Sequence, residues 1–286
     1  LALMRRSYRP KGFQRMKELW VPLSGAISQQ KLLDTVSNNV ANINTAGFKK
    51  DDLVFKEYLT AVDKGHDEID LPNKEWAPED FYKSYGAENS FVKVDGTYTN
   101  FSQGELRPTG NPLDFAIKGK GMFEVLAPNG VRFTRDGALS VNHDGILVNK
   151  DGFPILSKLE SQNAQSVGNP NDRFIHLAAG KIVVNDGGDI FTNDVKTSTL
   201  SIIEFEDQNA LVKEGQGIFI NKYADNIKKN ELHSTIHQGF IESSNVNALE
   251  EMTNMIKAHR NFESIQKVIK AYDNMSARSY SELTKF

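Results

Sequence analysis

The feature that most constrains the fold of this chain is a seven-residue apolar repeat at each end. The first repeat lies between Lys17 and Asn44, at positions Leu19, Ala26, Leu33 and Val40. The second lies in a stretch without Gly or Pro, from Asn245 to Leu283, at positions Ala248, Met255, Phe262 and Ile269. Such repeats predict amphipathic helices. At about 1.5 Å per residue they would measure roughly 40 and 58 Å, so both cannot lie inside one globule.

Local signals mark the ends of both predicted helices. Pro22 falls near the start of the first helix, where proline is tolerated. Gly47 follows the last residues of that helix and can adopt the left-handed conformation that ends many helices. Before the second helix, Ser243–Asn245 offers N-cap oxygens, and Glu250 and Glu251 complement the positive helix end. We therefore expect a defined exit from the first helix and a capped start of the second.

The first fifteen residues differ in composition from the rest of the chain. They contain five basic residues and no acidic one, and no apolar stretch follows that would form a secretory signal peptide. We interpret residues 1–15 as a misassigned translation start or an added segment, with a basic N-terminal arm as the alternative. The rest of the 286-residue chain holds 29 basic against 37 acidic side chains, which argues against a nucleic-acid partner.

The region between the repeats has the pattern of antiparallel β-structure. Short β-branched and aromatic runs lie between residues 115 and 220, separated by turn dipeptides such as Asn129-Gly130 and Asp144-Gly145. This pattern is typical of a hairpin-rich sandwich or irregular barrel. The predicted class is therefore mainly β with long terminal α-helices. The expected divisions are an N-terminal helix with an extended segment, an irregular connector, a central all-β domain and a C-terminal helix: 16–60, 61–88, 89–238 and 239–286.

No residue pattern in the chain predicts a catalytic, metal or cofactor site. The absence of cysteine excludes disulfides, thiolate nucleophiles and zinc–thiolate sites. His233 and His237 have a helical metal-binding spacing but no third ligand nearby, and we interpret them as a surface pair in a linker. Gly119–Gly121 and Asn142–Gly145 are only fragments of a phosphate loop and a calcium loop. Because none of these patterns forms a site, we expect no small-molecule substrate. No apolar run is long enough for a transmembrane helix, so we expect no direct membrane insertion.

A dense group of polar residues marks the end of the first predicted helix: Ser37, Asn38, Asn39, Asn42, Asn44 and Thr45. Asparagine is a poor helix former, and Asn38, Asn42 and Thr45 would share one face. One interpretation is an elaborate C-cap. The other is an amide-lined contact with a neighbouring helix, in which a wrong register would leave buried amides unpaired, at about 1 to 3 kcal/mol each.

Four segments of the chain resemble the bacterial flagellar rod, hook and hook-associated protein family. They follow one another in the family's order: SNNVANINTAGFK (37–49), QGELRPTGNPLDFAIKGKGMF (103–123), FTRDG (133–137) and GFIESSNVN (239–247). Glu251–Ile256 and Arg260–Glu263 look most like the proximal rod members, with distal rod or hook-type members as the alternative. The resemblance covers residues 16–286, and the first fifteen residues have no counterpart in the family.

The resemblance implies a structural subunit of the flagellar rod rather than an enzyme. It implies export by the flagellar type III apparatus without a cleaved signal peptide, and a place in the basal-body rod that crosses the periplasm. The implied partners are copies of the chain itself and other rod proteins. A β-sandwich that binds carbohydrate or acts on peptidoglycan is the alternative from another class, because such sandwiches often bind sugars.

We expect the terminal helices to pack together in the assembly and to carry the contacts between subunits. The residues expected there come from the apolar stripes and from the polar group with the turn that follows it: Leu33, Val36, Asn38, Asn39, Val40, Asn42, Gly47, Phe48, Met255, Phe262, Ile265, Ile269 and Tyr272. Because the chain cannot bury these stripes against its own small domain, the helices should be mobile in the free monomer. An antiparallel pair of the two helices within one chain is the alternative.

Overall fold

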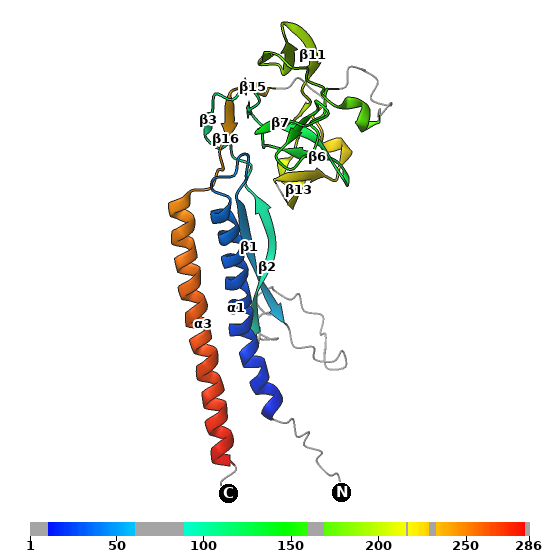
Figure 1. Cartoon of the computed structure of the whole chain (residues 1–286). Coiled ribbons are helices and arrows are strands. Elements are labelled where there is room, and N and C mark those ends of the chain that lie inside the picture. Colours follow the sequence, from blue (N-terminus) through cyan, green and yellow to red (C-terminus); the bar gives the residue numbers. More distant parts are fainter. Residues whose placement is uncertain (1–10, 61–88, 159–168, 216, 229–232, 284–286) are drawn as a thin grey trace, which may run out of the picture. The chain divides into compact units, whose positions relative to one another are not determined.

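The described chain consists of two long helices with β-strands between them in sequence (Figure 1). A computed structural model describes residues 11–60, 89–158, 169–215, 217–228 and 233–283. The helices are α1 (Lys11–Ala41) and α3 (Ala248–Leu283). The predicted class, mainly β with long terminal helices, is confirmed.

The strands between the helices are short except for the first two. In chain order they are β1 (Asp51–Thr60), β2 (Asn89–Thr99), β3 (Leu106–Pro108), β4 (Phe115–Lys118), β5 (Met122–Ala127), β6 (Gly130–Thr134), β7 (Leu139–Val141), β8 (Leu147–Asn149), β9 (Ile182–Val184), β10 (Asp189–Thr192), β11 (Val195–Thr199), β12 (Ile202–Ile203), β13 (Leu211–Gly215), β14 (Ile218–Asn221), β15 (Thr235–Gln238) and β16 (Phe240–Glu242). Short 3-10 helices span Pro170–Arg173, Gln208–Ala210 and Ala224–Asn226.

The largest sheet organises the β-rich part of the chain. Its strand order is β12-β5-β6-β14-β13, and β5 and β6 form a hairpin at the predicted Asn129-Gly130 turn. The remaining strands form a three-stranded sheet, β11-β10-β9, and pairs: β15-β4, β16-β3, β7-β8 and β1-β2. The β-structure expected from the turn dipeptides is therefore built largely from short antiparallel ladders.

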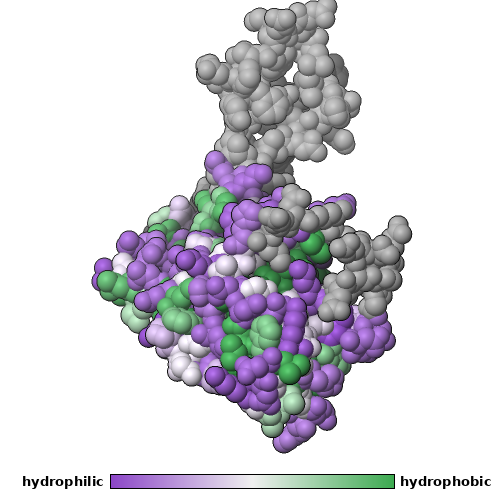
Figure 2. Space-filling view, turned by 90° about the horizontal axis from the view of Figure 1, so that it is seen from above, coloured by the Kyte–Doolittle hydropathy of each residue, from purple (hydrophilic) through white to green (hydrophobic). Residues whose placement is uncertain are grey.

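Strand β5 lies between two apolar clusters. Its residues Phe123 and Val125 belong to one cluster, and Met122 belongs to the other with Phe133 and Phe219. Successive side chains of a strand point to opposite faces, which is why one strand can serve both clusters. On the face seen in Figure 2, hydrophobic residues occur as small patches among hydrophilic ones.

The chain forms two compact units, and neither follows one continuous stretch of sequence. The helix unit contains the described residues of Leu1–Ser37, Leu53–Thr97 and Met252–Phe286. The β unit contains the described residues of Asn38–Asp52 and Tyr98–Glu251. The expected domain boundaries stay a prediction, and the expected connector, 61–88, lies outside the described residues.

Helix α1 differs from its prediction at its N-terminal end. It begins at Lys11, inside the stretch that we interpreted as an added segment, so Pro22 lies in the interior of the helix rather than in its first turn. Proline has no N–H, so α1 continues through one missing backbone hydrogen bond. Its C-terminal end is close to the prediction, since α1 ends at Ala41 and hydrogen-bonded turns continue to Gly47.

Strand β2 pairs with a partner that its own sequence does not indicate. We expected Asn89–Thr99 at the start of the central β domain, but β2 forms a two-stranded sheet with β1. Beside this sheet, the Ser28 hydroxyl of α1 donates a hydrogen bond to the Val92 carbonyl at 3.3 Å. The pairing joins segments on either side of the connector, and turn signals describe only neighbouring strands.

Replacing Phe219 by Ala tests the smaller apolar cluster. Phe219 is fully buried against this cluster and Phe101, so the variant should lose about 3 to 5 kcal/mol of unfolding free energy. Tyr223→Ala removes an exposed ring from the loop after the same strand and is the matched control. Denaturant unfolding of the full chain measures both, and equal losses would contradict the assigned core.

Candidate functional site

The exit of α1 requires glycine for two separate reasons. Gly47 has a φ of +66°, in the left-handed region that the sequence predicts. A Cβ at this position would lie 2.4 Å from the backbone of Arg135 and Asp136. The Gly47 N–H donates a hydrogen bond to the Glu242 carbonyl at 2.7 Å. The turn after α1 is therefore held between the segment after β6 and strand β16.

A buried group of three charged side chains, the junction cluster, lies directly beyond this turn. It consists of Lys49, Arg135 and Glu242, each at most 4% exposed. Lys49 Nζ forms an ion pair with Glu242 Oε1, and Glu242 Oε2 lies 3.0 Å from Arg135 Nη2. Backbone groups also bond to the cluster: Lys49 Nζ donates to the Ser102 carbonyl at 2.8 Å, and the Gly104 N–H donates to Glu242 Oε1 at 2.9 Å. The Arg135 guanidinium donates to the carbonyls of Gly119 and Gly121.

Burial and charge pairing act in opposite directions on this cluster. Burial lowers the pKa of Lys49 below its ordinary value, and the Glu242 carboxylate partly offsets the effect. Burial likewise lowers the pKa of Arg135, again opposed by Glu242. The Glu242 carboxylate therefore stabilises the charges of two buried cations.

Asn39 and Glu251 form a second buried contact in the β unit. The Asn39 side chain donates to the Asp51 carbonyl at 2.9 Å and accepts from the Asp51 N–H at 3.1 Å. It also donates to Glu251 Oε2 at 3.2 Å, and Lys50 Nζ lies 2.9 Å from Glu251 Oε1. Burial opposes the charge on Lys50, but Glu251 and neighbouring carboxylates outweigh it, so the pKa of Lys50 is raised. The end of α1 is thereby joined to the first turn of α3.

The amides near the end of α1 do not share one environment. Asn39 is buried, whereas Asn38 is exposed and Asn42 is half-buried. The Asn42 side chain donates to the Asn38 carbonyl at 2.8 Å and accepts from the Thr45 hydroxyl at 3.1 Å. Asn42 therefore has the local bonds that the C-cap interpretation predicts, and its place in a contact between subunits stays a prediction.

Phe48 lies inside the β unit together with the residues around it. Its ring is buried, and Lys213 Nζ lies 3.9 Å from the ring centroid. Lys213 also donates to the Lys49 carbonyl at 2.9 Å and pairs with Asp51 at 2.8 Å. Phe48 and Gly47 thus make their contacts within the chain.

The helix unit brings the apolar stripes of α1 and α3 together. A Cβ at Gly25 of α1 would lie in contact with Ile265 of α3, at 3.5 Å. The two helices lie side by side and run in opposite directions (Figure 1). Most of the stripe residues that we expected at subunit contacts and that belong to this unit are half-buried: Leu33, Met255, Phe262, Ile265 and Ile269. Val36 is buried and Tyr272 is exposed, and Val40, which belongs to the β unit, is half-buried.

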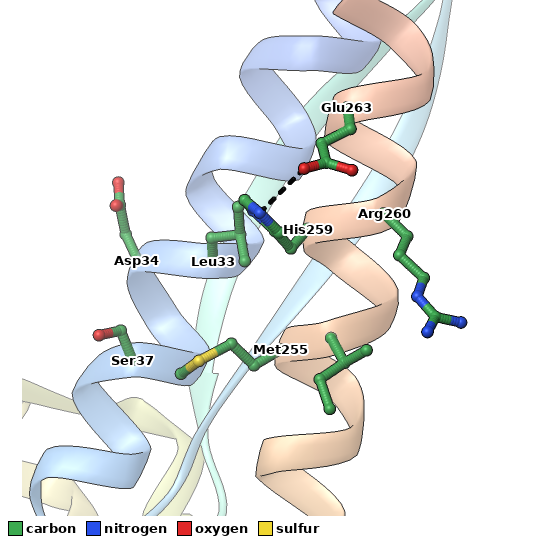
Figure 3. A pocket seen from close by; sticks show the side chains of 8 residues that line it. Leu33, Asp34, Ser37, Met255, His259, Arg260 and Glu263 are labelled. Atoms are coloured by element: carbon green, nitrogen blue, oxygen red, sulfur yellow. Dashed lines mark ion pairs between the residues drawn. The ribbon is translucent and has the colours of Figure 1, made fainter.

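An open groove of about 630 Å³ lies between the two helices (Figure 3). We call it the interhelical groove, and its lining residues are Leu33, Asp34, Ser37, Met255, Ile256, His259, Arg260 and Glu263. Met255 and His259 point toward α1 in Figure 3, whereas Arg260 points away from it. His259 Nε2 lies 3.3 Å from Glu263 Oε1. The groove therefore has an apolar floor and carboxylates at its rim.

Sequence reasoning missed the junction cluster, although three of the family-like segments contain its members. Lys49 ends the first segment, Arg135 lies in the third and Glu242 lies in the fourth. The available signal was the presence of a charged residue in each of these three segments. Glu251 lies in the first turn of α3 as expected, and the sequence did not indicate that it is also buried against Asn39.

The described residues show no grouping of three or more His, Asp and Glu side chains that could hold a metal ion. His237 lies in strand β15, paired with Ala116 of β4, so the interpretation of His233 and His237 as a linker pair is wrong for His237. The long-range pairing of β15 with β4 is the reason. No helix in the described ranges has the length and apolar character needed to span a membrane.

Comparison with known proteins gives matches along most of the chain. Three family models match: flagella basal body rod protein over residues 21–49, flagellar hook protein FlgE/F/G D1 domain over 116–199, and flagellar basal body rod FlgEFG protein C-terminal over 237–281.

Among similar proteins, the flagellar basal-body rod protein FlgF of Caulobacter vibrioides is 30% identical over 93% of this chain and 98% of its own length. The flagellar basal-body rod protein FlgG of a Buchnera aphidicola subspecies, that of Acyrthosiphon pisum, is 31% identical over 90% of this chain and 96% of its own. FlgF of Mesorhizobium japonicum is 29% identical over 86% and 89%.

Replacing Glu242 by Gln tests the junction cluster. The variant leaves Lys49 and Arg135 buried without their shared carboxylate, and such a loss costs about 3 to 5 kcal/mol of unfolding free energy. Lys196→Met removes an exposed lysine from its pair with the half-buried Asp189 at the protein surface and should cost at most about 1 kcal/mol. Urea unfolding of both variants checks the difference, and a loss for Glu242→Gln no larger than for the control would refute the role of the cluster.

Proposed function

The chain belongs to the flagellar basal-body rod protein family, and we propose that it polymerises with copies of itself and with other rod proteins into the drive shaft between motor and hook. Proteins of this family are structural, and the chain is a structural subunit of the rod in the flagellar basal body. A carbohydrate-binding or peptidoglycan-active protein is not favoured, because the relatives that match most of the chain are rod proteins.

The position of the chain within the rod and its export route are also part of the proposal. We place the chain in the proximal rod because of the segments Glu251–Ile256 and Arg260–Glu263. The distal rod is the alternative, because FlgF and FlgG proteins are about equally similar to the chain. Export through the flagellar type III apparatus without a cleaved signal peptide is also proposed, and it would bring the chain across the inner membrane. The partners are then the export apparatus during delivery and other rod subunits after it.

The observation that supports assembly best is the apolar surface left open on the terminal helices. On α1, Trp20, Leu23 and Ile27 are 41 to 58% exposed. On α3, Met252 and Ile256 are at least half exposed. Exposed apolar side chains gathered on two helices mark a protein-protein contact. We propose that these side chains contact neighbouring subunits together with the accessible members of the expected interface, which are Leu33, Asn38, Val40, Asn42, Met255, Phe262, Ile265, Ile269 and Tyr272.

Deleting the gene tests the structural function directly. The deletion strain should lack complete rods and be non-motile, and the full chain supplied in trans should restore both. Electron microscopy of isolated basal bodies and a swimming assay measure the result. Complete rods and normal swimming without the chain would end the proposal, whereas muramidase activity of the purified chain would favour the peptidoglycan-active alternative.

Hydrogen exchange on the dilute full chain tests whether the terminal helices order only on assembly. Because α1 and α3 pack through narrow half-buried stripes, their amides should exchange at least tenfold faster than those of β5, β6 and β14. The strand amides are the internal control. Equal protection of helices and strands would support a stable antiparallel helix pair in the free monomer instead.

A further inference from the structure

Two different surfaces of α3 suggest how one copy of the chain meets the next. The first is the interhelical groove, whose α3 side is formed by residues from Met255 to Glu263. The second is a ridge of exposed residues on another flank of the same helix, and its apolar members are Val268, 47% exposed, and Tyr272, 37% exposed. With about 3.6 residues per turn, Val268 lies about a third of a turn around α3 from Ile256.

The ridge is continuous along its flank of α3. Residues three or four apart in a helix share a face, and the ridge follows this spacing through Lys257, Asn261, Ser264, Val268 and Tyr272. All five residues are exposed. Rows of side chains with this spacing are the surfaces through which a helix packs against other helices.

Charge also distinguishes the ridge from the groove. The ridge contains one basic residue, Lys257, and no carboxylate. The rim of the groove carries the carboxylates of Asp34 and Glu263, while the Arg260 side chain points away from α1 in Figure 3. A ridge without carboxylates can approach this rim without like-charge repulsion, whereas a ridge with acidic residues could not.

We propose that the interhelical groove receives the α3 ridge of a second copy of this chain. The inference rests on the proposed function as a polymerising subunit and names the contact. Because groove and ridge lie on different flanks of α3, about a third of a turn apart around the helix, the contact joins unlike surfaces. A contact of this type leaves one groove and one ridge unoccupied at the ends, so copies add head to tail without closing into a symmetric dimer.

Disulfide cross-linking tests the contact, and because the chain has no cysteine of its own, only the introduced cysteines of this chain can form disulfides. The full chain with Ser37→Cys in the groove and Val268→Cys on the ridge is expressed in the deletion strain, and basal bodies are isolated and oxidised. The two positions are too far apart in one chain for a disulfide, which needs Cα atoms within about 7 Å. We expect a ladder at multiples of the 32.0 kDa chain.

The matched control moves the second cysteine by one residue. Ser37→Cys with Lys267→Cys places it on an exposed position that belongs to neither the groove nor the ridge. The ladder should be at least tenfold weaker in this variant. If the first pair is not incorporated into basal bodies, Asp34→Cys with Ser264→Cys serves in its place, with the same expected ladder.

The outcomes separate this inference from the proposed function. Basal bodies that contain the variant but give no ladder, or give equal ladders with both pairs, would overturn the groove contact and leave the rod assignment intact. A single dimer band would indicate a symmetric contact and would overturn the proposal. A product in which this chain is linked to another rod protein would indicate a different occupant of the groove and would overturn it as well. Absence of the unsubstituted chain from basal bodies would overturn the proposed function itself.

Filling the groove gives a second readout. Ser37→Trp places a large side chain where the ridge would lie, so incorporation into basal bodies should fall at least tenfold. Lys267→Trp adds the same side chain outside both surfaces and should leave incorporation unchanged. Circular dichroism of the two purified variants checks that both remain folded, and equal incorporation of the two would contradict the proposal.

Discussion

The ion pair between Lys49 and Glu242 is the interaction on which the arrangement of the β unit depends. A buried charge is unfavourable unless a partner charge and hydrogen bonds replace its water. Lys49 follows the turn after α1, Glu242 is the last residue of β16, and Arg135 follows β6 directly. The cluster therefore connects three segments that are far apart in the sequence. All three charges are compensated only when these distant segments meet. The cluster thus selects one arrangement of the chain more than it adds stability.

The same principle explains why Asn39 is buried near the end of α1, whereas Asn38 and Asn42 are not. Asn39 bonds both backbone polar groups of Asp51 and also reaches Glu251, so its amide is satisfied without water. Asn42 finds its partners within its own turn. A buried amide with a distant partner fixes how two segments meet, whereas a local one only ends a helix.

The two units of the chain differ in how completely they bury apolar surface. Phe123 and Phe219 of the β unit are fully buried, so its clusters need no other chain. The helix unit leaves Trp20 and Ile256 more than half exposed and has an open groove between its helices. A subunit that must join others can keep its fold in one unit and its contact surface in the other.

The sequence by itself determined the elements that depend on neighbouring residues. The heptad repeats predicted α1 and α3, Asn129-Gly130 predicted the β5–β6 hairpin, and Gly47 predicted the left-handed exit. Helical periodicity and turn conformation are local, so they can be read along the chain. Only the tertiary structure decided that β2 pairs with β1 and that Glu251 is buried against Asn39. Such contacts join segments far apart in sequence, and burial depends on all of them at once.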